Sequence, residues 1–139
     1  AWASDVSEKG FTRDGIGEVP DTEAIKKAAG SDEARWIGAD PRNPGKTVAT
    51  PGPELTITPE MRQAGYDNYQ TTDDHGMHMY GIAKDQNGTK YYIIKNSWGA
   101  AGTYKGIWYV SESFVKYKTM DILVNKNAIP QDIRTKLGL

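Results

Sequence analysis

The residues best suited to chemistry lie in one stretch, from Asp73 to Gly99, which reads DDHGMHMYGIAKDQNGTKYYIIKNSWG. His75 stands at the head of one apolar segment, and Asn96 stands at the tail of the next. An imidazole transfers protons near neutral pH, and an amide oxygen that accepts a hydrogen bond from the ring fixes which ring nitrogen faces the reacting group. Such a pair activates a nucleophile, yet the chain contains no cysteine. The sequence therefore presents a base and its orienting partner without an evident nucleophile.

Two strands joined by a turn are needed to bring this histidine and asparagine together. The runs at residues 76–83 and 90–97 are rich in aromatic, β-branched and methionine side chains, and they flank the turn-forming segment DQNG. This pattern predicts a β-hairpin with His75 at the head of its first strand and Asn96 near the end of its second.

The length of the hairpin loop decides whether the two side chains meet. A strict two-residue Asn-Gly turn would place His75 opposite Ala100 and Asn96 opposite Met79, which separates the pair by roughly 13 Å along the strands. Placing His75 opposite Asn96 leaves a longer connection over residues 83–88, which includes two poor strand formers. We expect the longer loop, although the local turn signal favours the shorter one.

Composition divides the chain near Ile57. Residues 1–57 are dense in proline and glycine, which favours turns and extended segments, whereas residues 58–139 carry sharper cap and strand signals. These signals predict helices over residues 21–30, 58–65, 111–118 and 129–137, and further strands over residues 106–110 and 120–125. We expect one α+β domain, with loops and one short helix in its first part and a β-rich second part that ends in a helix.

Charge and hydropathy argue against several classes of partner. The net charge is −1 and basic residues are interleaved with acidic ones, so no basic patch is predicted for nucleic acid or an anionic membrane surface. No apolar run approaches the roughly 18 residues of a transmembrane helix. The absence of cysteine excludes disulfide bonds but leaves the compartment open.

Two motifs carry a family resemblance. DHGMHMYG (residues 74–81) and NSWG (residues 96–99) resemble the histidine and asparagine boxes of the papain-like cysteine peptidases, in which a glycine follows the histidine by six positions, as Gly81 does here. The wider chain resembles the bleomycin hydrolase and aminopeptidase C branch, through AWASDVSEKGF, TPEMRQAGYDNYQTTDDHGMH and KGIWYVSESFVKYKTMDILVNKNAIP, and least between Asp21 and Pro53. The implied fold is α+β, the C-terminal, mainly antiparallel β half of that fold with short peripheral helices.

The resemblance implies a role for each site residue. His75 is the general base and acid beside a cysteine thiolate, and Asn96 accepts a hydrogen bond from the far side of its ring. Trp98 resembles the indole that in this family shields the pair from water. It follows Asn96 by two residues, so we expect it on the same face of the strand. Asp74 has a supporting role.

The same resemblance explains the missing nucleophile, since in this family the cysteine lies in the N-terminal half. It implies that this chain is the second half only and is inactive alone, with a peptide substrate and the Cys-bearing half as its partners and a homo-oligomer as a further candidate. It favours a cytoplasmic location. The match ends at Leu139, so the C-terminal arm that enters the cleft in this branch is expected to be short or missing, which leaves the cleft open to longer or N-terminally blocked peptides.

Other readings of these residues remain open. Gly76 and Met77 are candidates for lining a substrate pocket, although methionine more often fills a core. No cofactor is predicted. No metal site is predicted either, because His75 and His78 point to opposite faces of a strand and cannot converge on one ion. Trp2, Trp36 and Trp108 are predicted to be packing residues.

Two other classes of function also remain. One is a non-catalytic peptidase homologue that acts as a binding or structural module. The other is a β-rich binding domain in which NSWG is coincidental.

Overall fold

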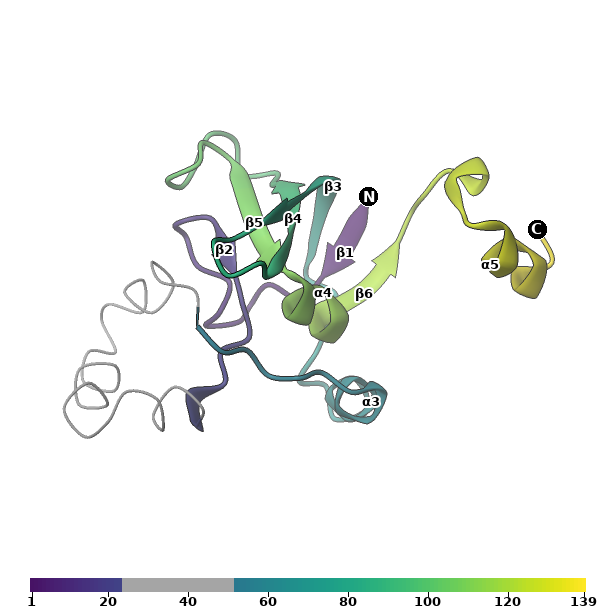
Figure 1. Ribbon diagram of the computed structural model, residues 1–139, viewed down its shortest axis with the longest axis horizontal. Coiled ribbons are helices and arrows are strands. Elements are labelled where there is room, and N and C mark those ends of the chain that lie inside the picture. The colour runs from purple at the N-terminus through teal and green to yellow at the C-terminus, as the bar shows by residue number, and fades with distance from the viewer. Residues whose placement is uncertain (24–51) are drawn as a thin grey trace.

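A curled sheet forms the body of the computed structural model, which describes residues 1–23 and 52–139 (Figure 1). Within these residues six strands pair in the order β2-β5-β4-β3-β1-β6. All neighbours are antiparallel except β2 and β5. The strands are β1 (Trp2–Ser4), β2 (Ile16–Gly17), β3 (His75–Lys84), β4 (Lys90–Lys95), β5 (Ile107–Ser111) and β6 (Thr119–Ile122).

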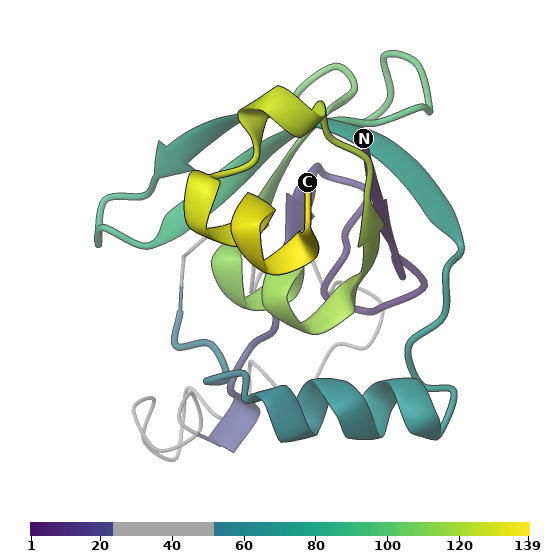
Figure 2. The same ribbon diagram turned by 90° about the vertical axis from the view of Figure 1, so that its right-hand side faces the viewer.

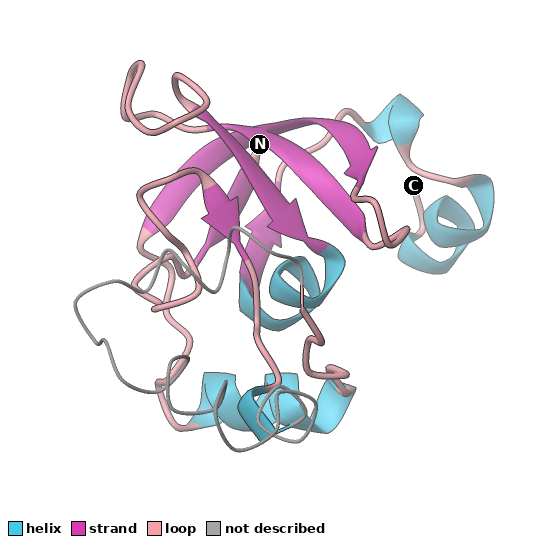
Figure 3. Cartoon of the chain, turned by 60° about the vertical axis from the view of Figure 1, so that its left-hand side comes forward, coloured by secondary structure: helices cyan, strands magenta, loops and turns pink. Residues whose placement is uncertain are grey.

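Short helices lie around this sheet, as Figures 2 and 3 show. They are α3 (Pro59–Asp67), α4 (Glu112–Lys118), the 3-10 helix η1 (Lys126–Ala128) and α5 (Gln131–Leu137). The expected α+β class, a mainly antiparallel β half with peripheral helices, is therefore confirmed. None of the helices in the described ranges combines the length and apolar character that crossing a membrane requires.

Capping residues explain where the helices begin. The Thr58 hydroxyl accepts a hydrogen bond from the Met61 backbone nitrogen at 3.2 Å, and a proline follows it as the first residue of α3. The Ser111 hydroxyl accepts from the Phe114 nitrogen at 3.1 Å and caps α4 in the same way. Helices were predicted at both places and are confirmed, as is the terminal helix α5. The helix predicted over 21–30 lies outside the described residues, apart from its first three positions.

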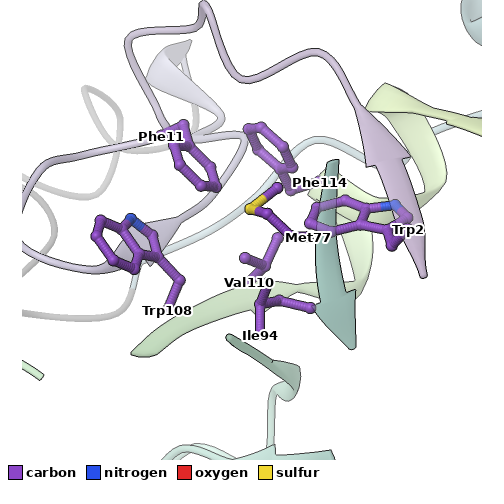
Figure 4. Packing of buried hydrophobic residues seen from close by; sticks show 7 residues of the cluster. All are labelled: Trp2, Phe11, Met77, Ile94, Trp108, Val110 and Phe114. Carbon is purple, nitrogen blue, oxygen red and sulfur yellow. The ribbon is translucent and has the colours of Figure 1, made fainter. Parts of the chain in front are cut away.

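The hydrophobic core lies inside the curl of the sheet. Its side chains come from the N-terminal segment, from three neighbouring strands and from α4, and Figure 4 shows them meeting: Trp2, Phe11, Met77, Ile94, Trp108, Val110 and Phe114. Trp2 and Trp108 pack as predicted, and Trp36 lies outside the described residues. Through Trp2 and Phe11 the N-terminal segment contributes to the same core as the later strands.

The hairpin of β3 and β4 has a shorter loop than predicted. Ala83 pairs with Tyr91 and Lys84 with Lys90, so the expected loop over 83–88 is wrong at its first two residues. The connection is tightened by Asp85, whose Oδ1 accepts from the backbone nitrogens of Asn87 and Thr89 at 2.8 Å each. This side-chain cap of the turn, made by one poor strand former, allows the other, Lys84, to stay in the ladder.

The register matches neither of the two expected alternatives. Met79 pairs with Ile94 and Gly81 with Ile93, so Tyr80 is an extra residue that shifts the ladder by one. The strand predicted over 90–97 also ends early, at Lys95, and Asn96 lies beyond it. A bulge depends on packing of the finished sheet, which explains why the local turn signal did not reveal it.

The C-terminal segment departs from the sheet after β6. The strand predicted over 120–125 is placed at 119–122 instead, and three apolar residues that end or follow it, Ile122, Leu123 and Val124, are exposed. Beyond them η1 and α5 extend away from the sheet (Figure 1).

Candidate functional site

The side chains of His75 and Asn96 meet at the end of the hairpin. Nε2 of His75 lies 2.7 Å from Oδ1 of Asn96. An amide oxygen only accepts hydrogen bonds, so Nε2 must be the donor, and in the neutral ring this leaves Nδ1 as the unprotonated nitrogen. The arrangement therefore gives the imidazole one fixed tautomer, with a basic nitrogen turned away from the asparagine.

The backbone on either side fixes the position of each residue. His75 opens β3, and there it pairs with Ser4 of β1. Asn96 is 2 % exposed, and its backbone nitrogen donates to the Gly106 carbonyl at 3.0 Å. Gly106 has φ of +88°, and a Cβ at this position would lie 2.0 Å from the Gly99 carbonyl oxygen. Only glycine permits the close approach that closes this loop behind Asn96.

Trp98 covers the imidazole. The centre of its indole lies 4.7 Å from that of the His75 ring, with the two planes tilted by 35°. The prediction that Trp98 shares the strand face of Asn96 is wrong, because β4 has ended by that point and Trp98 lies in the following loop. The indole is held instead by edge-to-face contacts with Trp108 at 5.6 Å and Phe11 at 6.2 Å.

Two residues near the site were not predicted from the sequence. The Ser97 hydroxyl lies 3.5 Å from Nε2 of His75, next to the hydrogen bond with Asn96. Phe11 reaches the site from the N-terminal segment, 64 positions away from His75 in the numbering. The NSWG motif itself was a signal for Ser97, whereas nothing local in the sequence connects Phe11 with the histidine.

Asp74 makes its hydrogen bonds away from the imidazole. Its Oδ1 accepts from the Val6 backbone nitrogen at 2.9 Å, and its Oδ2 accepts from the Ser7 hydroxyl at 2.5 Å. Asp74 thus ties the N-terminal segment to the residue that precedes His75.

The remaining candidates divide between the core and the surface. Met77 is 4 % exposed and belongs to the core, whereas Gly76 is exposed beside His75. His78 is exposed and stacks on Tyr80 with ring centres 6.2 Å apart. No group of three or more histidine, cysteine, aspartate or glutamate side chains arranged to hold a metal ion occurs in the described part of the chain.

A second buried polar group lies where the N-terminal segment meets β4 and α4. The Tyr91 hydroxyl donates to Glu18, and Glu54 accepts from the Val19 nitrogen at 2.7 Å and from the Ser111 hydroxyl at 2.6 Å. Burial is the main cause that raises the pKa of both carboxyls, and the hydrogen bonds that each accepts oppose the rise. The charge of Asp85 adds to the rise in the pKa of both, and the charge of Glu54 adds to that of Glu18. Burial and the bond to Glu18 likewise raise the pKa of Tyr91.

Comparison with known proteins places the site in context. The family model of the Peptidase C1-like family matches residues 54–138, which is more than half of the chain and includes both His75 and Asn96. A search of curated proteins found no match.

Proposed function

Because the chain belongs to the Peptidase C1-like family and is thus related to the papain-like cysteine peptidases, we propose that it is the His- and Asn-bearing half of a peptidase of the bleomycin hydrolase and aminopeptidase C type. His75 is its general base and acid, and Asn96 orients the ring. The observation that carries the proposal is the 2.7 Å contact between His75 Nε2 and Asn96 Oδ1 beneath the Trp98 indole.

In this mechanism the free Nδ1 of His75 faces a cysteine thiol supplied by the N-terminal half of the same protein. Nδ1 takes the thiol proton, and the resulting thiolate is stabilised by the imidazolium. The sulfur attacks the peptide carbonyl carbon, and the imidazolium then gives its proton to the departing amine. Water, deprotonated by His75, hydrolyses the thioester and releases the cysteine.

Asn96 and Trp98 keep this ion pair productive. A neutral amide orients the imidazole without adding a negative charge, so thiolate and imidazolium remain the formal charges of the site. The indole of Trp98 excludes water from the Nε2 hydrogen bond, and a bond in a drier environment is stronger.

The surface around the imidazole supports the proposed partner. Trp98 is 46 % exposed, and Ser97 and Gly76, which precede Trp98 and follow His75 in the chain, are exposed as well. An indole that is half open to water next to a candidate base is suited to burial against another domain. In the proposal that domain is the Cys-bearing half, and the peptide lies in the cleft between the two halves.

The test is hydrolysis of a dipeptide reporter by the protein that contains both halves. His75→Ala should lower the rate by about a thousandfold and stop alkylation of the active cysteine at neutral pH. Asn96→Ala should lower it by about tenfold to a hundredfold, because the base remains but its orientation is lost. His78→Ala is the matched control, since that imidazole is exposed and stacks on Tyr80.

Parental rates in both His75→Ala and Asn96→Ala would refute these roles. A glycine or alanine in place of the cysteine in the N-terminal half would support the other candidate, a non-catalytic homologue, which the absence of cysteine from this chain keeps open.

A further inference from the structure

A buried lysine at the end of α4 contacts the segment that leads into His75. Lys118 is 3 % exposed, and its ammonium donates to the Thr71 hydroxyl at 3.1 Å and to the Gln70 carbonyl at 3.2 Å. It also forms an ion pair with Glu8. An ammonium has three hydrogens to donate, so these three acceptors satisfy it completely.

The main chain of the same lysine holds the N-terminal segment. The Lys118 carbonyl accepts from the Ser4 hydroxyl at 2.9 Å and from the Asp5 backbone nitrogen at 3.1 Å. One residue thus joins three parts of the chain that are far apart in sequence: the segment after β1, the end of α4, and the segment that leads into β3.

Asp5 extends this connection toward the histidine. It is 4 % exposed, and its Oδ2 accepts from the Thr72 backbone nitrogen at 3.0 Å. Its Oδ1 accepts from the Ser7 nitrogen at 3.0 Å, and Ser7 in turn donates to Asp74. Four of the five residues from 70 to 74 are therefore held by these bonds, two through backbone atoms (Gln70 and Thr72) and two through side chains (Thr71 and Asp74), and the next residue is His75.

The chemistry at Lys118 favours control of position over stability. A buried ion pair loses hydration energy on folding, and apolar residues of similar size often stabilise a protein as well or better. What a buried ammonium adds is a set of directional bonds to particular oxygen atoms. Lys116, two residues earlier in α4, is exposed and pairs with Glu112 on the surface.

We propose that Lys118 is a positioning residue for His75, which acts through residues 70–74 to hold the imidazole in line with Asn96. Its importance for peptide hydrolysis rests on the proposed function. Its effect on the geometry of His75 does not, and can be measured on the chain itself.

The tautomer of His75 provides that measurement. The chain has two histidines, so the ring nitrogens of His75 and His78 can each be followed by ¹⁵N NMR. At about pH 8.5, two units above the ordinary imidazole pKa of about 6.5, His75 should show protonated Nε2 and unprotonated Nδ1. In Lys118→Met the two shifts of His75 should converge, as in a freely exchanging imidazole, while those of His78 stay constant. Lys116→Met is the matched control and should leave both rings unchanged.

Two milder variants guard against a loss of fold in Lys118→Met. Thr71→Val removes one acceptor with little change of shape, and Glu8→Gln removes the charge partner. Each should move the His75 shifts in the same direction by a smaller amount. Wild-type His75 shifts in a folded Lys118→Met chain would overturn the proposal. If Lys118→Met does not fold, wild-type shifts in both milder variants would overturn it.

Kinetics of the protein with both halves separates this proposal from the one on which it rests. Lys118→Met should lower kcat about tenfold with KM within twofold, because misplacement of a catalytic group acts mainly on the chemical step. Moved His75 shifts without any kinetic effect would leave Lys118 as a positioning residue and count against His75 as the base. Unmoved shifts with a lower melting temperature would show a structural role alone.

Discussion

The segment before His75 and the loop after Asn96 flank the same site, but the contacts that hold them differ in kind. Residues 70–74 are held by buried polar groups, chiefly Lys118 and Asp5. The loop after Asn96 is held by aromatic packing of Trp98 on Trp108 and Phe11, and by close backbone contacts. Polar bonds are directional, whereas aromatic burial removes a large area from water. We therefore expect the His75 side to set alignment and the Asn96 side to supply stability.

The largest effect should come from the aromatic side. Trp108 is 1 % exposed, stacks on Phe11, and donates from its indole nitrogen to the Thr12 carbonyl at 2.9 Å. Trp108→Ala should lower the free energy of unfolding by about 3–5 kcal/mol, because it leaves a cavity and an unpaired carbonyl. Urea unfolding followed by circular dichroism measures this.

Trp98→Ala is the control for Trp108→Ala, since its side chain is half exposed and less burial is lost. Equal costs for the two substitutions would contradict the view that the aromatic cluster stabilises the loop through its buried member.

The next effect concerns the backbone of the same loop. Gly106→Ala would force a Cβ to within 2.0 Å of the Gly99 carbonyl at a positive φ, so the loop must move. We expect a cost of about 2 kcal/mol or more, above the 1–2 kcal/mol of left-handed strain alone. The His75 ring nitrogens should also lose their fixed tautomer, because the Asn96 nitrogen bonds to Gly106.

Gly99→Ala separates strain from collision. Gly99 also has a positive φ, of +65°, but a Cβ there meets no atom within 4 Å. It should cost about 1 kcal/mol and leave the His75 tautomer intact. If Gly99→Ala disturbs His75 as much as Gly106→Ala does, the close approach at Gly106 is not what places Asn96.

Local signals predicted much of the framework. The caps at Thr58 and Ser111 predicted α3 and α4, because a cap acts on residues three positions away. The contact between the side chains of His75 and Asn96 was also expected, although the strand register that produces it was not. The observed register depends on an extra residue at Tyr80, which no turn signal indicates.

Contacts between distant segments were beyond local reasoning. The insertion of β1 between β3 and β6 brings Trp2 into the core and Ser4 beside His75. The residues around Lys118 do not indicate that its ammonium is buried, because its acceptors at Gln70 and Thr71 lie 47 or more positions away in the sequence. Such contacts are properties of the assembled sheet.

The smallest effect should come from the pH dependence of stability, which distinguishes two kinds of buried polar group. Lys118 has an opposite charge as its partner, whereas Glu18 and Glu54 face each other and Asp85, all of the same sign, with the Tyr91 hydroxyl as a donor. Burial is the main cause that raises the pKa of both glutamates above 4.5. Between that ordinary value and the raised native value, the folded state binds more protons than the unfolded state. Stability contributed by these groups is therefore complete below pH 4.5 and is lost as the pH rises through the native pKa values.

Glu18→Gln tests this sign, because the amide oxygen still accepts from Tyr91 while the charge is removed. The variant should be more stable than the parent at pH 8 and gain nothing at pH 4.5, as measured by urea unfolding at the two values. Glu112→Gln should do the opposite, since bonds to Lys90 and Lys116 lower the pKa of that exposed carboxyl and its small contribution is present only above its unfolded pKa. The opposite outcome would be a parent that loses stability between pH 8 and pH 4.5 and that matches Glu18→Gln at both values. The buried glutamates would then be ionised without cost, and the contrast with Lys118 would not hold.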